Sequence, residues 1–220
     1  MRIMENFLDK SNLSERIYYY LRNQIVQNQM PPGTRINYEQ LASDLNVSRM
    51  PLREAVNQLS QDGLIEVKPR SGTFVNTPKR QDIEDLYDLR RALEELSVEL
   101  AIPEIPLSII EKLEDETSYS EEQLNKRIVE PFFDADRNLH RTLIDYSNNI
   151  RLQQIWKSIE TQVQWVGVII TTNLDRPFAA NDMHKEILRA IKKRETDTAK
   201  QLMRDHINQI KAFTISDHGQ

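Results

Sequence analysis

The chain has 220 residues, of which 29% are charged and 39% hydrophobic, and its formal net charge is −5. This length allows one sizeable domain or two small ones, and the low content of Gly (5) and Pro (9) favours a helix-rich folded protein over a disordered or fibrous one. Cysteine is absent, which excludes disulfides, thiolate metal sites and a cysteine nucleophile.

The charge is distributed unevenly along the chain. Residues 11 to 80 carry 9 Lys and Arg against 6 Asp and Glu, whereas residues 81 to 220 carry 18 against 26. A mildly basic N-terminal part fits a small nucleic-acid-binding module joined to a second module. The N-terminus lacks the continuous apolar segment of a signal peptide, and nowhere do about 18 apolar residues follow one another. We therefore expect a cytoplasmic protein without membrane association.

Three helices are expected in the N-terminal part. Apolar residues recur at helical spacing over residues 13 to 25, with Ser11 or Ser14 available as the N-cap. Asn37 is positioned to cap a brief second helix, and Ser48 to cap a third. The turn between the second and third helices is tight, which is typical of a helix-turn-helix.

The third predicted helix carries two arginines at its beginning. Arg49 and Arg53 are one turn apart and share a face, which suits the N-terminal end of a helix that enters a DNA major groove. Two short strands joined by "KPRSG" follow, and this hairpin offers Lys68 and Arg70 to a phosphate backbone or minor groove. The alternative is that the arginines only solvate an exposed helix face and pair with Glu54 or Asp62.

Several motifs follow one another over residues 21–75: PG-x-R, LA-x-x-L-x-V-S-R-x-P-x-R-E-A, L-x-x-x-G-L-I and G-x-F-V. In this order they resemble the winged helix-turn-helix of the GntR family of bacterial transcription regulators. The resemblance implies that Arg49 and Arg53 contact operator DNA. It also implies that Ser48 contacts a phosphate or base and that Gly72 lies at the tip of the wing.

From residue 81 onward the apolar residues form long helical stripes, without strand-like alternation of any length. About six helices in roughly 140 residues indicate an antiparallel bundle, with seven helices as the longer variant. The predicted fold class is mainly α, with a winged helix-turn-helix and its two-stranded wing followed by an all-α bundle. We expect a DNA-binding domain at residues 8–76, a linker at 77–80 and the helical domain at 81–215.

Three of the four histidines, and one aspartate, fall on the apolar stripes of this bundle. Asp136 and His140 are one turn apart on one stripe, while His184 and His206 lie on the stripes of two later helices. An unpaired buried polar group costs about 1 to 3 kcal/mol, so mutual satisfaction around one metal ion is the simplest solution. These donors suit Zn²⁺, Ni²⁺, Co²⁺ or Mn²⁺. The alternative is that each histidine is a hydrogen-bonded core residue and that Asp136 pairs with His140.

Three segments carry a second resemblance: "YDLRRALEELSVELA", "DADRNLHRTLIDYSNN" and "MHKEILRAIKKRETDTAKQLMRDHI". They are similar to FCD, the ligand-binding domain of the FadR subfamily within GntR. In metal-containing members of this family the metal ligands are an aspartate, the histidine four residues later and two later histidines. These positions match Asp136, His140, His184 and His206 here. The resemblance further implies a homodimer on a palindromic operator, with a small organic acid in the bundle altering operator affinity. Arg90 could pair with the acid's carboxylate or form a surface salt bridge with Glu94, and Asn149 could hydrogen-bond the acid.

Three functions are compatible with these patterns. The first, which we expect, is a transcription regulator and most often a repressor in this family, controlled by a small carboxylate effector at the metal site. The second is a metal-dependent hydrolase or other metalloenzyme with an accessory DNA-binding domain, but no general base is evident near the donors. The third is an architectural DNA-binding protein whose bundle only dimerises, which leaves the inward histidines unexplained.

Overall fold

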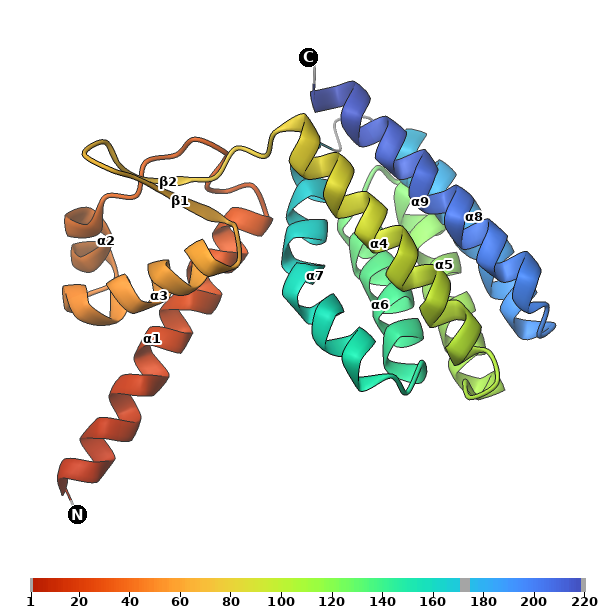
Figure 1. Ribbon diagram of the computed structural model, residues 1–220, viewed down its shortest axis with the longest axis horizontal. Helices are drawn as coiled ribbons and strands as arrows, with labels where there is room; N and C mark the ends of the chain where they lie inside the picture. The colour runs from red at the N-terminus through yellow and green to blue at the C-terminus, as the bar shows by residue number, and fades with distance from the viewer. Residues whose placement is uncertain (1, 171–174, 219–220) are drawn as a thin grey trace. The chain divides into compact units, whose positions relative to one another are not determined.

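The computed structural model describes residues 2–170 and 175–218, and these fold into nine helices and one two-stranded sheet (Figure 1). In chain order the elements are α1 (Arg2–Val26), α2 (Tyr38–Asp44), α3 (Arg49–Gln61), β1 (Ile65–Lys68), β2 (Gly72–Val75), α4 (Arg80–Ala101), α5 (Leu107–Asn125), α6 (Glu130–Tyr146), α7 (Ile150–Ile170), α8 (Asp175–Lys192) and α9 (Thr196–His218). The mainly α class is confirmed, with a wing after three helices and six helices, not seven, in the described part of the C-terminal region. No helix among the described residues is both long and apolar enough to cross a membrane.

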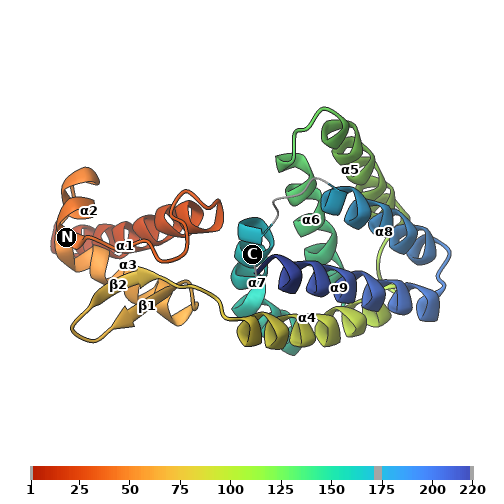
Figure 2. The same ribbon diagram turned by 90° about the horizontal axis from the view of Figure 1, so that it is seen from above.

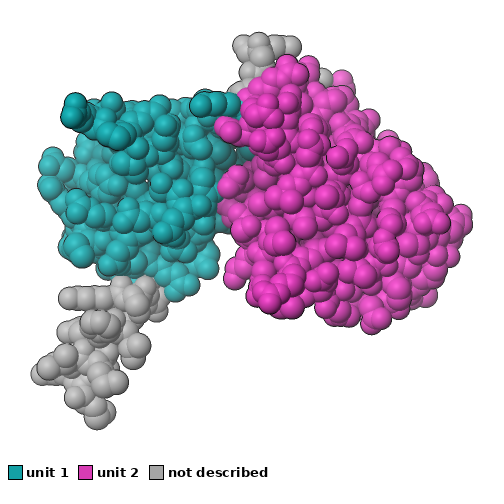
Figure 3. Space-filling view, viewed as in Figure 1, with its two compact units in different colours: residues 1–79, 164–169 teal, residues 80–163, 170–220 magenta. Residues whose placement is uncertain are grey.

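The chain divides into two compact units (Figure 3). They are a first unit of residues 1–79 and 164–169, and a second unit of residues 80–163 and 170–220. The first division along the chain falls where α4 begins, next to the expected linker at residues 77–80. The domain bounds expected from the sequence, residues 8–76 and 81–215, stay predictions.

In the first unit, α3 packs against α1, α2 and β1. The contact is apolar, because Leu52, Val56 and Leu59 of α3 are fully buried. Burying one such side chain contributes about 1.5 to 3 kcal/mol. A helix of 13 residues is marginal by itself in water, so this packing is what holds α3 in place.

The N-caps of α2 and α3 agree only in part with those predicted from the sequence. Asn37 caps α2 as predicted, because its Oδ1 accepts the backbone N–H of Glu39 at 3.0 Å and of Gln40 at 3.2 Å. Ser48 occupies the N-cap position of α3, but its side chain makes no capping hydrogen bond. The Ser48 hydroxyl is therefore not committed to the α3 backbone.

α1 begins earlier than predicted. It starts at Arg2, so Ser11 and Ser14 lie within the helix and neither is its N-cap. The segment before Ser11 contains no Pro or Gly, and nothing in it ends a helix. The Ser14 hydroxyl donates instead to the Glu54 carboxylate of α3.

The wing is an antiparallel hairpin in which Lys68 of β1 pairs with Gly72 of β2. The chain turns between the strands at Arg70, whose φ is 63°, and β2 begins at Gly72, whose φ is 130°; both values lie in the region that disfavours side chains. Residues 33–36 run along the free edge of β2, where Gly33 and Val75, and Ile36 and Thr73, join backbone N–H and C=O groups. The wing is thereby tied to the segment between α1 and α2.

In the second unit, the helices α4, α5, α6, α8 and α9 pack around a common interior (Figure 2). α4 packs against α9 and α6, α9 packs against α8, and both α8 and α6 pack against α5. Each helix contributes fully buried side chains to this interior; one from each is Ile83, Ile110, Leu143, Ile187 and Met203. The inward faces of α4, α6, α8 and α9 are therefore neighbours.

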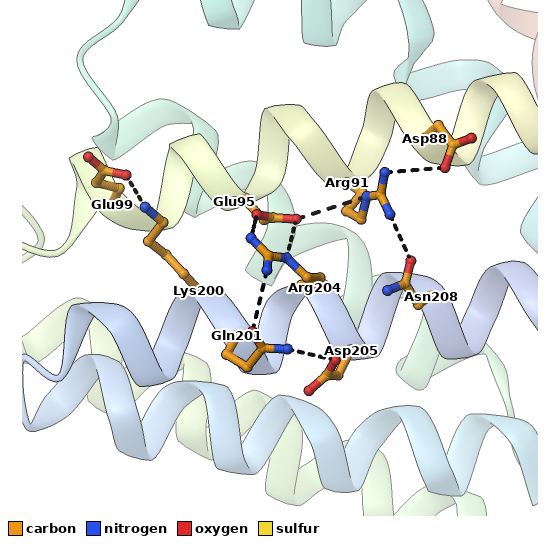
Figure 4. Close-up of polar contacts among 9 residues, drawn as sticks. All are labelled: Asp88, Arg91, Glu95, Glu99, Lys200, Gln201, Arg204, Asp205 and Asn208. Atoms are coloured by element: carbon orange, nitrogen blue, oxygen red, sulfur yellow. Dashed lines mark hydrogen bonds and ion pairs between the residues drawn. The ribbon is translucent and has the colours of Figure 1, made fainter.

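α4 and α9 run antiparallel, and polar contacts join their outer sides (Figure 4). In these contacts each step forward along α4 is matched by an equal step back along α9: Glu99–Lys200, Glu95–Arg204, Arg91–Asn208 and Asp88–Lys211. We call these four pairs the α4–α9 ladder. Three of the four are ion pairs at partly exposed positions and the fourth is a hydrogen bond to an uncharged amide. Ion pairs near the surface contribute only about 0 to 1 kcal/mol each, so the ladder bears more on the register of the two helices than on stability.

Candidate metal centre and DNA-contacting surface

Four side chains predicted to face inward come together inside the second unit: Asp136, His140, His184 and His206. Each offers one ligand atom, and the four atoms lie within 4.8 Å of one another. We call this group the Asp/His cluster.

The helices explain how the Asp/His cluster forms. Asp136 and His140 are four residues apart on α6, so their side chains leave the same face of the helix. His184 comes from α8 and His206 from α9, which pack against each other. The three histidines are at most 2% exposed, whereas the Asp136 side chain is 25% exposed. The cluster is therefore most accessible on the side of Asp136.

The donor atoms are spaced as ligands of one ion would be. His184 Nε2 lies 3.1 Å from His206 Nε2, and Asp136 Oδ1 lies 3.4 Å from His184 Nε2 and 3.5 Å from His140 Nε2. Nitrogen and oxygen ligands about 2.0–2.1 Å from a tetrahedral ion lie about 3.3 Å from one another. The geometry of the Asp/His cluster fits such an ion.

Glu94 of α4 is a further polar residue at the cluster, and sequence reasoning missed it. Its carboxylate contacts Nδ1 of His140 and accepts the Nε–H of Arg90 at 2.6 Å. Because a carboxylate can only accept, Nδ1 carries the proton of neutral His140 and the lone pair is left on Nε2. His140 Nε2 is buried and has no hydrogen-bond partner. Such an orphaned atom beside three other donors is what a metal ion would satisfy.

Burial and neighbouring charges set the protonation of the cluster. Burial opposes a charge on Asp136, but His140 and His184 outweigh it and hold the pKa of that carboxyl well below its usual range. Burial also opposes a charge on His140, but the Glu94 carboxylate outweighs it and raises the pKa of His140 to about 9. Burial lowers the pKa of His184 and, more strongly, that of His206. At neutral pH the carboxylate is anionic and two imidazoles are neutral, so only His140 has to lose a proton when a cation binds.

The donor set suits a divalent metal ion. One carboxylate oxygen and three imidazole nitrogens are typical ligands of Zn²⁺ and are accepted by Ni²⁺, Co²⁺ and Mn²⁺. An ion that takes more than four ligands would keep positions for water or for an oxygen of a small molecule. The exposed side of Asp136 is where such a molecule could approach.

Arg90 and Asn149, expected at an effector, both have partners within the protein. Arg90 is 3% exposed, so its ion pair with Glu94 lies in the interior and the surface salt bridge considered from the sequence is wrong. Asn149 caps α7, because its Oδ1 accepts the backbone N–H of Arg151 at 3.1 Å and of Leu152 at 3.2 Å. Arg90 is thus linked to the Asp/His cluster through Glu94, and Asn149 has a structural role at the start of α7.

The residues predicted to contact DNA lie at two places on the first unit. These are the N-terminal end of α3 and the wing, which carry Ser48, Arg49, Arg53, Lys68, Arg70 and Gly72. All are exposed except Gly72, which is half-buried. Arg49 pairs with Glu39 of α2 at 2.8 Å, and not with Glu54. Both side chains of that pair are more than two thirds exposed, so the pair is weak and leaves Arg49 able to reach another partner.

Two protein-family models match the chain. Residues 13–75 match the family described as bacterial regulatory proteins, gntR family. Residues 85–209, more than half of the chain, match the FCD domain. The first match covers α1 from residue 13 onward, α2, α3 and the wing, and the second covers the residues of the Asp/His cluster.

Proteins similar to this chain over most of its length are named as transcriptional regulators. The chain is 30% identical over 197 residues to the uncharacterized HTH-type transcriptional regulator YdhC of Bacillus subtilis, covering 88% of this chain and 87% of YdhC. It is 27% identical over 201 residues to the HTH-type transcriptional repressor RspR of Escherichia coli, covering 90% and 87% of the two chains. The crystal structure of a transcriptional regulator described as GntR from Rhodococcus sp. RHA1 superposes with a TM-score of 0.80 at 24% identity, covering 92% and 97%. That last likeness shows the fold alone.

Proposed function

The chain belongs to the gntR family of bacterial regulatory proteins and carries an FCD domain, and on this premise we propose that it is a repressor controlled by a small organic acid at a metal site. Its relatives are DNA-binding transcriptional regulators and not enzymes, so the metalloenzyme that the donor set also allowed is set aside. The repressor role is supported by the name of the Escherichia coli relative RspR.

One observation carries the proposal: the Asp/His cluster lies buried in the helical unit of a chain whose other unit has a DNA-binding fold. Three buried imidazoles and a carboxylate are costly to place in a protein interior unless they are satisfied. A bundle that served only to dimerise an architectural DNA-binding protein would need no such cluster. A ligand-responsive regulator has a use for it.

In this proposal α3 is the recognition helix. Its N-terminal end enters the major groove, where Arg49 and Arg53 donate to guanine edges or phosphates. The Ser48 hydroxyl, which is not used to cap α3, is available to a phosphate. Lys68 and Arg70 of the wing contact the adjoining backbone or minor groove. A homodimer with a two-fold axis would read both halves of a palindromic operator.

The effector in this proposal is a small carboxylate. Asp136 Oδ1 and the Nε2 atoms of the three histidines would hold the metal ion, and a bound ion supplies Lewis-acidic positions that attract carboxylate oxygens. Arg90 donates its Nε–H to Glu94, and the guanidinium has four further N–H groups that suit another oxygen of the acid. Asn149 uses its Oδ1 as a cap and would contact the acid through its Nδ2 donors.

Control of operator affinity requires that the acid distinguish two conformations of the helical unit. The acid shifts the equilibrium only by the difference between its affinities for the two. In a homodimer that shift would change the spacing of the two recognition helices. By thermodynamic reciprocity, the operator must change the affinity of the acid by the same factor.

The test starts from a DNA duplex selected from a random-sequence pool by the metal-loaded protein. Fluorescence anisotropy then measures the affinity of the protein for this duplex in the presence of individual mono- and dicarboxylates, including sugar acids. Each titration is done with the metal-loaded and with the chelated protein. We expect at least one acid to change the affinity of the metal-loaded protein only. Arg49→Ala should lose the duplex under all conditions, whereas Asp136→Asn should keep the duplex and lose the response.

Two results would contradict the proposal at different points. An acid response that survives both chelation and Asp136→Asn would place the effector away from the Asp/His cluster. Failure of the selection to enrich any duplex, or intact binding by Arg49→Ala, would contradict the assignment of α3.

A further inference from the structure

Glu94 is a buried carboxylate that contributes no ligand to the Asp/His cluster. It is 0% exposed, and its two oxygens have different partners: Oε1 accepts the Nε–H of Arg90 at 2.6 Å, and Oε2 contacts Nδ1 of His140. Arg90 and His140 are at most 3% exposed. The three side chains therefore form a line, guanidinium to carboxylate to imidazole, that ends at the cluster.

A carboxylate in this position needs both partners. Removing an ion from water costs several kcal/mol unless opposite charge and hydrogen bonds replace the water. The charge of Arg90 balances that of Glu94, and the His140 N–H satisfies the second oxygen. An apolar residue would fill the space between α4 and α6 at lower cost, so the presence of a buried carboxylate bound to His140 points to a role at that residue.

We propose that Glu94 is the positioning residue of the metal site: it holds the His140 proton on Nδ1 and so directs the Nε2 lone pair at the metal ion, while Arg90 fixes the carboxylate. The inference rests on the proposed metal binding. It assigns to α4, a helix that supplies no ligand, the orientation of a ligand on α6.

The surroundings of His140 support this assignment. Its ring stacks on that of His206 with centroids 5.3 Å apart and planes 15° from parallel, and the edge of the His184 ring meets it at 5.4 Å. The ring thus has little room to turn. With Nδ1 bound to Glu94, Nε2 is the atom on the side of Asp136, at 3.5 Å from Oδ1. A carboxylate behind a histidine ligand fixes both the tautomer and the ring orientation.

Glu94→Gln makes the sharpest test, because glutamine has the same shape but only one acceptor. The Arg90 guanidinium has only donors, so it takes the glutamine oxygen and leaves the NH₂ group facing His140. Nδ1 must then accept, and the proton moves to Nε2, where it blocks coordination. Glu94→Asp keeps the carboxylate but shortens its reach, and should lose less.

The neighbouring residue Glu95 supplies a matched control. It is a carboxylate on the same helix, but it faces outward and pairs with Arg204 in the α4–α9 ladder (Figure 4). Glu95→Gln therefore removes the same charge from α4 without touching the cluster.

The measurement is the affinity of the full chain for Zn²⁺, and separately for Ni²⁺, by competition with a chelator of known affinity. We expect binding to be about 10- to 100-fold weaker in Glu94→Gln, less reduced in Glu94→Asp and within a few fold of wild type in Glu95→Gln. Circular dichroism shows whether each variant folds. Wild-type affinity in a folded Glu94→Gln variant would overturn the positioning role while leaving the proposed metal site intact.

A second measurement does not depend on a variant. Long-range ¹H–¹⁵N correlation on zinc-loaded wild-type protein reports which nitrogen of His140 carries the proton. A protonated Nδ1 with metal-bound Nε2 is expected, and a metal-bound Nδ1 would overturn the inference. If the wild type binds none of these ions, it is the proposed metal site that fails, and with it the role of Glu94.

Discussion

His184→Ala removes the donor that has the closest neighbours in the Asp/His cluster. His184 Nε2 lies 3.1 Å from His206 Nε2 and 3.4 Å from Asp136 Oδ1, so its loss leaves three donors and opens the middle of the site. We expect the variant to lose the stabilisation that a divalent metal gives the wild type. The apo protein also changes, because a buried ring is removed. The quantity to compare is therefore the melting temperature with metal minus that with chelator, for each protein.

The expected size follows from linkage. Metal at about 100 times its Kd stabilises the wild type by about 2.7 kcal/mol. The helical unit has roughly 140 residues, and an unfolding entropy of about 2.1 cal/mol/K per residue then gives a rise of about 9 °C in melting temperature. If the variant binds 100-fold more weakly, the same metal concentration gives only about 0.4 kcal/mol, or about 1 °C.

Differential scanning calorimetry of the full chain can resolve this difference, with Zn²⁺, Ni²⁺, Co²⁺ and Mn²⁺ tested in turn. His218→Ala is the control for removing a histidine as such, since the Asp/His cluster found among the described side chains is made of the other three of the four histidines. If no ion shifts the wild type, or if His184→Ala keeps the full shift, the reasoning from donor spacing to metal binding is refuted.

Three further predictions concern other parts of the molecule. Arg49→Ala and Arg53→Ala should each abolish binding of the selected duplex in an anisotropy titration, with thermal stability nearly unchanged because both side chains are exposed; binding at wild-type strength would exclude α3 as the recognition helix. Gly72→Ala should destabilise the first unit by about 1 kcal/mol or more, because φ is 130° and the new Cβ would lie 3.2 Å from Arg35 Nε. If the calorimetric unfolding transition of the first unit is unchanged, the wing relaxes to accommodate the new side chain and this prediction is wrong. Asn181→Ala should cost about 1 to 3 kcal/mol in chemical denaturation, since its side chain accepts from Ser120 at 2.6 Å in the core, yet metal content measured by elemental analysis should stay at the wild-type level.

Much of the Asp/His cluster could be predicted from periodicity. Asp136 and His140 share a helical face by their spacing of four, and His184 and His206 lie among apolar residues that had to face the interior. What periodicity cannot give is distance. That atoms from α6, α8 and α9 lie within 4.8 Å of one another depends on how the helices pack.

The role of Glu94 cannot be predicted from the residue pattern of its own helix. Arg90 and Glu94 are four residues apart, which is also the spacing of ordinary surface ion pairs, and Glu94 lies next to the outward-facing Glu95. The structure distinguishes the two carboxylates: Glu94 is buried against His140 of α6, whereas Glu95 pairs with Arg204 on the outer side of α4. A charged residue adjoining an apolar stripe, with an opposite charge one turn away, is the signal that could have raised the question.

Helix ends were predicted less well than helix faces. Asn37 caps α2 as its residue type suggests, but Ser48 holds the N-cap position without making the bond. α1 passes through Ser11 and Ser14 because a capping residue is effective only where the chain has another reason to begin a helix there. The preference of a residue type for the N-cap position is weak, and the residues that precede it decide where the helix begins.

The order of the four donors along the chain has a consequence for folding. Asp136 and His140 meet within one helix, but His184 reaches them across 44 residues and His206 across 66. Closing loops of that length has an entropic cost that grows only slowly with length, and the free energy of ion binding to the folded site would offset it, whereas a disulfide acts mainly by restricting the unfolded chain. In a chain without cysteine, the Asp/His cluster would thus tie the middle of the sequence to α9 as a disulfide does in other proteins, with chelation taking the place of reduction.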